Sequence, residues 1–321
     1  MMKAQTGVAL VSVLLIVAIA TVMAVAMIQE QQSSIQITRG YLSRTQSFQY
    51  ALGGEELARQ ILYEDFALGT SRDFIGETWS DPELHFEFEE GEVNLRITDL
   101  QGLVNLNALA DGGSSQVIAK QRLLNLIAAQ GGDTSNVDRL QDWIDEDTGS
   151  RPAGAEDFDY LMFDPPYRAG NRPMAHASEA RLTGITDEQY RLIEPVLTAL
   201  PTATSRLNVN SAPALVLQSL SPQLTLDVAE SIAEGRFEQE GFESVEEFLQ
   251  LPQLAGLGMS ADGLGVQSAF FEVRVIARYQ DRYSYLTSLI HRDTISGEQS
   301  VLSRNFMRNF QPENVSKQTD G

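Results

Sequence analysis

The residues of this chain best suited to chemistry lie in one acidic stretch, DWIDEDTGSRPAGAEDFDY, which runs from Asp142 to Tyr160. Asp145, Asp147 and Glu156 have the spacing of positions 1, 3 and 12 of an EF-hand loop, which carry its main oxygen ligands for calcium. The match is partial, because position 5 is a glycine, position 6 is a serine where the turn needs glycine, and a proline follows at position 8. We therefore do not expect a true EF-hand.

Two interpretations of this acidic stretch stay open on spacing alone. In the first, the stretch is an irregular calcium loop, in which Asp157 and backbone carbonyls join the same three carboxylates as ligands. A cation is expected there because so many carboxylates held together without one would repel one another. In the second, the stretch is a solvated acidic turn with Trp143 and Tyr160 packed beneath it.

Other residue types offer little for catalysis. The chain has no cysteine, which excludes disulfides, thiolate catalysis and zinc–thiolate sites. Its three histidines, His85, His176 and His291, are too far apart to form a local metal motif, and none is paired by spacing with a nucleophile. A membrane-anchored periplasmic hydrolase with paired carboxylates is the competing class. Because the acidic residues cluster in one loop, we predict that the chain is not an enzyme.

The segments LNVNSAPALVLQSL, residues 207–220, and GFESVEEFLQL, residues 241–251, resemble the helix-hairpin-helix of competence-type DNA-binding proteins. The hairpin between the two helices, residues 220–224, lacks the glycines that present backbone amides to phosphates. With 23 Lys and Arg against 44 Asp and Glu, the net charge is −21, which opposes binding to nucleic acid. We predict a structural helical module without nucleic acid as partner; a DNA-uptake protein is the alternative.

The elements that must position these residues begin with an apolar N-terminal helix. Residues 8–28 carry no charge over 21 residues. At about 1.5 Å per residue such a helix is roughly 31 Å long, enough to cross a bilayer. Lys3 before it favours a cytoplasmic N-terminus, which places the rest of the chain beyond the membrane. A cleaved signal peptide is less consistent, because the helical pattern continues through residues 29–60.

The start of this helix resembles that of type IV pilins and pseudopilins, in which a short basic leader ends in glycine directly before a long apolar helix. The resemblance implies that a prepilin peptidase removes residues 1–7, cutting between Gly7 and Val8, and that the new N-terminus is methylated. The family usually has a glutamate at the fifth mature position. Here that position is Ser12.

Beyond residue 80 the hydrophobic period changes twice. Alternation at residues 84–97 and at residues 271–291 predicts two β-hairpins. Between them the pattern is helical, with segments expected at 114–130, 136–144, 178–180, 186–200, 212–220, 224–234 and 245–249. We predict an α+β fold, in which a transmembrane helix over 8–28 continues into an α/β head formed by 29–101 and 263–310. An all-helical domain over 102–262 is inserted in the head, and 311–321 form a disordered tail.

Taken together, the chain resembles the family of general secretion pathway protein K, the large minor pseudopilins of type II secretion systems. The carrying segments are the leader with Ser12, ALGGEELARQIL at 51–62, DLQGLVNLNAL at 99–109, LQDWIDEDTGSRPAGAEDFDYL at 140–161, YRAGNRPMAHASEAR at 167–181 and LNVNSAP at 207–213. The resemblance implies a pseudopilin fold, calcium bound in the inserted domain and a complex with I-type and J-type minor pseudopilins. It also implies a place in the inner membrane with the bulk of the chain periplasmic, a role at the pseudopilus tip in protein export, and secreted substrates as a further class of partner.

Overall fold

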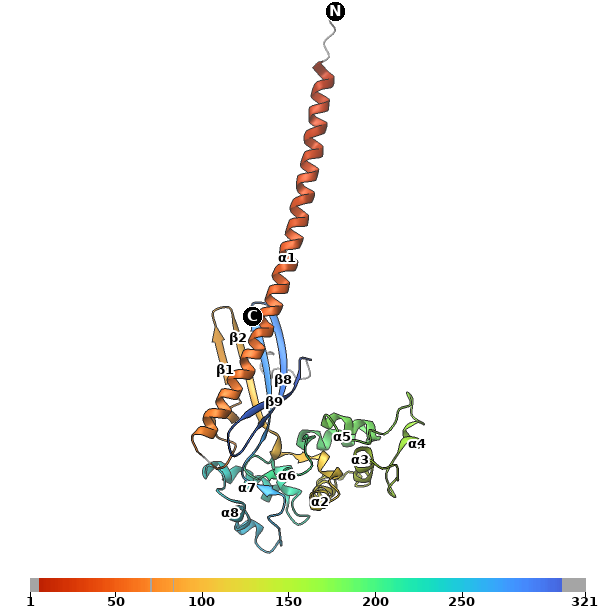
Figure 1. The fold of residues 1–321 in the computed structure, drawn as a ribbon, viewed down its shortest axis with the longest axis vertical. Helices are drawn as coiled ribbons and strands as arrows, with labels where there is room; N and C mark the ends of the chain where they lie inside the picture. Colours follow the sequence, from red (N-terminus) through yellow and green to blue (C-terminus); the bar gives the residue numbers. More distant parts are fainter. Residues whose placement is uncertain (1–5, 70, 83, 308–321) are drawn as a thin grey trace, which may run out of the picture.

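The computed structural model describes residues 6–69, 71–82 and 84–307. The first residues of the predicted leader, 1–5, and the predicted disordered tail, 311–321, lie outside the described residues. Figure 1 shows a long N-terminal helix that ends in a small head, with a helical domain attached at the end of the head opposite to the N-terminus.

Helix α1 runs from Thr6 to Ala67 without interruption, over 62 residues. Its apolar N-terminal part is long and apolar enough to span a membrane, and residues 10–39 are exposed. From Ser43 onward one face of the helix becomes buried, because it packs on the head. The predicted continuation of the apolar helix into the head is confirmed.

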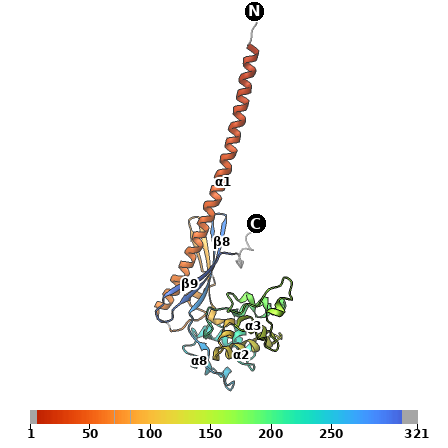
Figure 2. The same ribbon diagram turned by 45° about the vertical axis from the view of Figure 1, so that its right-hand side comes forward.

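The head contains one antiparallel sheet, in which the strand order is β1-β2-β7-β8-β9. The strands are β1 (Leu84–Phe88), β2 (Gly91–Asp99), β7 (Phe270–Tyr279), β8 (Arg282–Arg292) and β9 (Gln299–Asn305). Both predicted hairpins are present, as β1–β2 and β7–β8. The edge strand β9 was not predicted. Helix α1 lies along one face of the sheet (Figure 2) and contacts β2, β7 and β8.

The contact between α1 and the sheet depends on a glycine. A Cβ atom built on Gly54 would lie 2.6 Å from Cγ1 of Val275 and 2.8 Å from Cγ1 of Val93. Ala51, Ala58 and the sheet valines complete the same buried core. The small residues on this helix face therefore let the backbone of α1 approach the strands closely.

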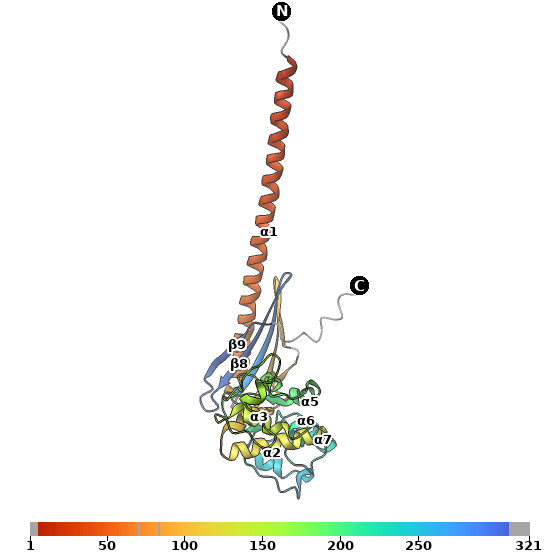
Figure 3. The same ribbon diagram turned by 90° about the vertical axis from the view of Figure 1, so that its right-hand side faces the viewer.

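The segment between β2 and β7 forms a separate unit, here called the inserted domain, with its own hydrophobic core. Its α-helices are α2 (Ser114–Ala129), α3 (Asn136–Ile144), α4 (Asp157–Tyr160), α5 (Asp187–Ile193), α6 (Ala214–Gln218), α7 (Leu226–Glu238) and α8 (Val245–Leu249). Short 3₁₀ helices lie at η2 (Leu100–Gly102), η3 (Leu106–Ala110), η4 (Ala177–Thr183), η5 (Glu194–Val196) and η6 (Pro252–Leu254), and η1 (Thr78–Ser80) belongs to the head. Figure 3 shows the inserted domain packed beneath the sheet, away from the apolar end of α1.

The inserted domain is not wholly helical. It contains two parallel pairs of two-residue strands, β3 (Val104–Asn105) with β4 (Leu197–Thr198) and β5 (Leu207–Asn208) with β6 (Leu264–Gly265). The helix expected over 186–200 ends at Ile193, because Pro195 lacks an amide hydrogen and begins a 3₁₀ turn. Because β6 pairs with β5, the inserted domain extends to the start of β7, past the boundary expected at residue 262.

The close approach at Gly54 leads to a prediction with a matched control on the neighbouring residue. Gly54→Ala should destabilise the head by about 1–3 kcal/mol, because the added methyl group forces the helix away from the sheet. Gly53 is exposed and has no atom within 4 Å of a Cβ position, so Gly53→Ala should be neutral or stabilising by up to about 1 kcal/mol. Urea unfolding of the full chain in detergent, followed by Trp79 fluorescence in a Trp143→Phe background, measures both. Equal stability of the two variants would contradict the proposed contact.

Candidate metal centre

The acidic stretch forms a loop between the C-terminal end of α3 and the short helix α4. Trp143, in the last turn of α3, and Tyr160, at the end of α4, are both buried, and their rings meet edge to face with centroids 5.2 Å apart. Tyr167 stacks on Tyr160 from the segment that follows. This aromatic platform holds the two ends of the loop together, so the packing expected beneath the acidic turn is present.

Three of the four predicted ligands converge. Asp145, Asp147 and Glu156 each place a carboxylate oxygen within 4.8 Å of the others. Calcium binds oxygen at about 2.3–2.6 Å, so two oxygens on one ion lie no more than about 5 Å apart. The spacing of these three groups therefore fits one calcium ion.

Several oxygens of this group are buried without a hydrogen-bond partner. They are Oδ1 of Asp145 and both carboxylate oxygens of Glu156. Buried carboxylate oxygens without donors are costly, and a cation supplies the missing interaction. The donor set, which consists of hard oxygen atoms only, is the one that calcium prefers.

The structure does not bring the fourth predicted ligand, Asp157, into the group. Its carboxylate accepts hydrogen bonds from the Arg168 guanidinium and from the backbone amide of Ala169, both at 2.9 Å. Asp157 is the first residue of α4, and these contacts turn its side chain toward the segment after the loop. Asp157 therefore connects the start of α4 to the segment that contains Arg168 and Ala169.

Two residues near the group were not assigned from the sequence. Asp142 is fully buried and accepts from the backbone amide of Arg151 at 3.0 Å and from its guanidinium, which also contacts Asp145 at 2.5 Å. Asn171 donates to the carbonyl of Asp147 at 3.2 Å, and its own Oδ1 is buried without a partner. Asp142 belongs to the acidic stretch itself, whereas no spacing signal connects Asn171 with a loop 24 residues earlier.

The electrostatics of the loop favour a bound cation. Burial, followed by the charges of neighbouring aspartates, raises the pKa of Glu156 to about 7. Burial also raises the pKa of Asp145, although Arg151 acts in the opposite direction. Arg151 is the one cation that contacts Asp142 and Asp145 among the described residues. The folded loop without metal thus retains a proton on Glu156 near neutral pH, and a metal ion would displace it.

The remaining sequence-predicted residues take structural positions. Gly7 and Val8 lie in the first turns of α1, and Ser12 follows on the exposed part of the same helix. His85 and His291 lie in β1 and β8, where His85 bonds to Asn94 at 2.7 Å and His291 packs on Phe270.

His176 caps η4, with its Nδ1 accepting from the backbone amide of Ser178 at 3.1 Å. The predicted helical pair around residues 220–224 is present as α6 and α7, which pack on each other.

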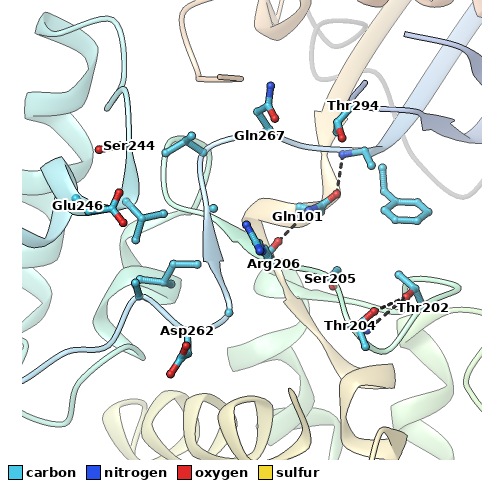
Figure 4. Close-up of a pocket in the computed structure, with 18 of the residues that line it drawn as sticks. Gln101, Thr202, Thr204, Ser205, Arg206, Ser244, Glu246, Asp262, Gln267 and Thr294 are labelled. Carbon is cyan, nitrogen blue, oxygen red and sulfur yellow. Dashed lines mark hydrogen bonds between the residues drawn. The ribbon is translucent and has the colours of Figure 1, made fainter. Parts of the chain in front are cut away.

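A cavity of about 850 Å³ lies where the inserted domain meets the sheet (Figure 4). Gln101 crosses one wall of it, donating to the carbonyl of Arg206 at 2.9 Å and accepting from the amide of Ala269 at 2.6 Å. The lining is rich in hydroxyl and amide groups, among them Thr202, Thr204 and Ser205. Among the described residues that line it, no hydroxyl is hydrogen-bonded to His291.

Comparison with known proteins gives a consistent result. Two family models, both described as type II secretion system (T2SS), protein K, match residues 102–202 and residues 207–267. Type II secretion system protein K of Pseudomonas aeruginosa is 34% identical over 317 residues, covering 95% of this chain and 93% of the relative. The protein of the same name from Klebsiella pneumoniae is 33% identical over 298 residues, covering 87% of this chain and 91% of the relative.

A solved structure is similar over most of its length. The crystal structure of the GspK–GspI–GspJ complex from the enterotoxigenic Escherichia coli type 2 secretion system contains a chain that superposes with a TM-score of 0.70 at 26% identity. The match covers 84% of this chain and 99% of that chain. The α+β fold is therefore shared with a known structure over most of this chain.

The raised pKa of Glu156 gives the metal centre a defined pH dependence. Below about pH 7, protons compete with calcium for this carboxylate, so calcium affinity should fall about tenfold per pH unit. Glu156→Gln should weaken binding and remove the dependence on pH. Asp157→Asn, which alters the carboxylate bonded to Arg168, should leave affinity within about twofold. Calorimetric titration of the full chain in detergent at several pH values measures all three, and loss of binding in Asp157→Asn would show that Asp157 is a ligand after all.

Proposed function

The chain belongs to the family of type II secretion system protein K, and from that premise we propose that it caps the tip of the pseudopilus and supports protein export across the outer membrane. It is a minor pseudopilin of the type II secretion system, and the family is one of structural pseudopilins and not of enzymes. Its apolar N-terminal helix makes it a membrane-anchored pseudopilin.

The observation that carries the capping proposal is the position of the inserted domain. In all three views it lies at the end of the head opposite to the apolar end of α1 (Figures 1–3). In a helical array of pseudopilins, α1 helices stack in the filament core and heads follow one another along the axis. A domain of this size beyond the head would meet the next subunit, whereas at the tip there is no next subunit.

Ser12 supports the same role by its chemistry. A subunit in the filament body needs a carboxylate to neutralise the N-terminal ammonium of its neighbour inside the apolar helix bundle. A hydroxyl cannot do so, and an unpaired buried charge costs on the order of several kcal/mol. The topmost subunit has no neighbour above it whose charge needs pairing, so serine is tolerated there.

The partners follow from the related assembly. The solved relative is a complex of GspK with GspI and GspJ. We propose that this chain assembles with I-type and J-type minor pseudopilins in the same way, and that secreted substrates are a further class of partner.

We also propose that calcium is a structural cofactor of the inserted domain. Asp145, Asp147 and Glu156 would hold it, and their unpartnered oxygens support the assignment. When bound, the ion supplies positive charge that Arg151 alone does not provide to the loop. It would fix α4 relative to α3.

Processing completes the proposal. A prepilin peptidase would cut between Gly7 and Val8 and the new N-terminus would be methylated, leaving the mature protein in the inner membrane with its head and inserted domain in the periplasm. The support is the glycine that ends a short leader directly before the apolar helix.

The capping role predicts where the protein lies on the filament. Immunogold labelling should mark one end of each pseudopilus, and deletion of the protein should change pseudopilus number or length. Ser12→Glu and Ser12→Ala should both secrete within about twofold of the wild type, because a terminal subunit pairs with no ammonium above it. Gold particles along the whole shaft would rule out capping.

The processing proposal predicts one new N-terminus. Mass spectrometry of the membrane form should find Val8 as the first residue, with a methyl group on its nitrogen. Gly7→Val should block the cut, whereas the matched change Ala4→Val should not. An N-terminus beyond Ala20 would instead indicate cleavage by signal peptidase.

A further inference from the structure

The chain crosses between the head and the inserted domain twice, after β2 and before β7, and both crossings meet in one buried polar network. Four carboxylates belong to it, from the end of α1, the segment before η1 and the end of β2. These junction carboxylates are Asp65, Asp73 and Asp99, which are buried, and Glu77, which is partly buried.

Asp99 holds the two crossings together. Its buried carboxylate accepts hydrogen bonds from the amide of Gln101 at 2.8 Å, from Nδ2 of Asn208 at 2.9 Å and from the hydroxyl of Ser268 at 2.6 Å. The hydroxyl of Ser211 donates to it as well. All four donors lie in the inserted domain, whereas Asp99 ends a strand of the head sheet.

Arg292, on β8, supplies the positive charge of the network. It is buried and pairs with Asp65 at 3.0 Å and with Asp73. It also donates to the carbonyl of Ser268 at 3.3 Å and lies over the ring of Phe271 at 4.7 Å. The amide of Ser268 donates to Asp73 at 2.7 Å. Arg292 is the one cation that contacts the junction carboxylates among the residues that the structure describes.

Glu77 has neutral donors only. Its Oε2 accepts from the indole of Trp79 at 2.7 Å and from the amide of Phe74 at 3.0 Å. The carboxylates that face it are Asp65 from α1 and Asp73 from its own segment, and the three groups lie within 4.8 Å of one another. Asp99, from β2, adjoins Asp73.

The charges of the network do not balance. With every group ionised, three buried carboxylates and the partly buried Glu77 would face one guanidinium, and both desolvation and mutual repulsion oppose that state. Burial raises the pKa of Glu77 to about 7 and that of Asp65 to about 6, and it also raises the pKa of Asp99. Protons retained on these groups relieve the imbalance.

We propose that the junction network retains protons while the inserted domain is packed on the head. Loss of these protons at higher pH weakens the packing, so the network acts as a proton-controlled latch, that is, a pH-dependent contact between the two units. The proposal depends on the contacts of the junction and not on the capping function.

The direction of the effect follows from linkage. When the junction opens, the segment that carries Asp73 and Glu77 loses its hydrogen bonds to Ser268 and Asn208 and becomes more hydrated, so the pKa of Glu77 returns toward its ordinary value of 4.5. Opening must then release the proton, so opening becomes easier as the pH rises from about 4.5 to about 7 and levels off above that. Asp65 acts in the same direction at lower pH.

The absence of cysteine makes the motion measurable in the full chain. Ser303→Cys on β9 and Gln121→Cys on α2 are exposed positions on the two units and accept one fluorophore each. Energy transfer between them, in detergent with chelator throughout, reports their separation. We expect the ratio of open to closed molecules to rise about tenfold or more between about pH 5.5 and 8.

Two variants distinguish an effect of proton loss from Asp65 and Glu77 from a general effect of pH on the chain. Asp65→Asn with Glu77→Gln keeps acceptors for Arg292 and Trp79 but removes two of the groups that retain protons, so its closed fraction should change much less with pH than that of the unchanged chain. Glu89→Gln alters an exposed carboxylate of the head and should respond like the unchanged chain. A constant separation at every pH, or an equal response in Asp65→Asn/Glu77→Gln, would overturn the proposal.

A second readout does not depend on movement or on the double variant. Trp79 is fully buried and donates to Glu77, so its emission should titrate near pH 7 in a Trp143→Phe background. The transition should disappear in Glu77→Gln alone. Emission that does not change over this range, or that still titrates in Glu77→Gln, would show that Glu77 does not gain or lose the proton.

Discussion

Asp99 is the last residue of β2, and its buried carboxylate receives hydrogen bonds from residues near both ends of the inserted domain. A buried carboxylate is tolerated only when its oxygens are satisfied, so Gln101, Asn208, Ser211 and Ser268 must all stay in place around it. The position of the whole inserted domain on the head follows from this requirement. Two hydrophobic cores that are built separately are joined here through polar contacts.

Two asparagine pairs make equivalent hydrogen bonds inside the inserted domain. In the first copy, Asn105 accepts from the amide of Asn107 at 3.1 Å, and Asn107 exchanges hydrogen bonds with the backbone of Met174. In the second, Asn208 accepts from the amide of Asn210 at 3.0 Å, and Asn210 exchanges hydrogen bonds with the backbone of Phe242. In each copy the first asparagine lies in a two-residue parallel strand. The two strand pairs are short because these side chains, rather than a long ladder, satisfy the backbone.

This division of the chain into two units is compatible with the tip position that we propose for this minor pseudopilin. The α1–sheet contact, which places Gly54 against Val275, involves no residue of the inserted domain. The acidic loop between α3 and α4 can therefore be ordered or loosened without disturbing the contact between α1 and the sheet. The junction at Asp99 and Arg292 is the place where a change in one unit reaches the other.

The sequence by itself determined the features that depend on residues close together in the chain. An uncharged run over residues 8–28 can only be a long apolar helix, and alternation with period two at 84–97 and 271–291 marks the two hairpins, since both patterns arise from local backbone geometry. The spacing of Asp145, Asp147 and Glu156 likewise placed three carboxylates in one loop.

Tertiary structure decided which oxygens remain without partners, because Asp157 turns to Arg168 and Asn171 arrives from another segment. It also brought Arg292 to Asp65 and Asp73, and Asn208 to Asp99, across more than a hundred residues. Buried polar partners are chosen by which chain segments the packing brings into contact, and no local period of the sequence records that choice.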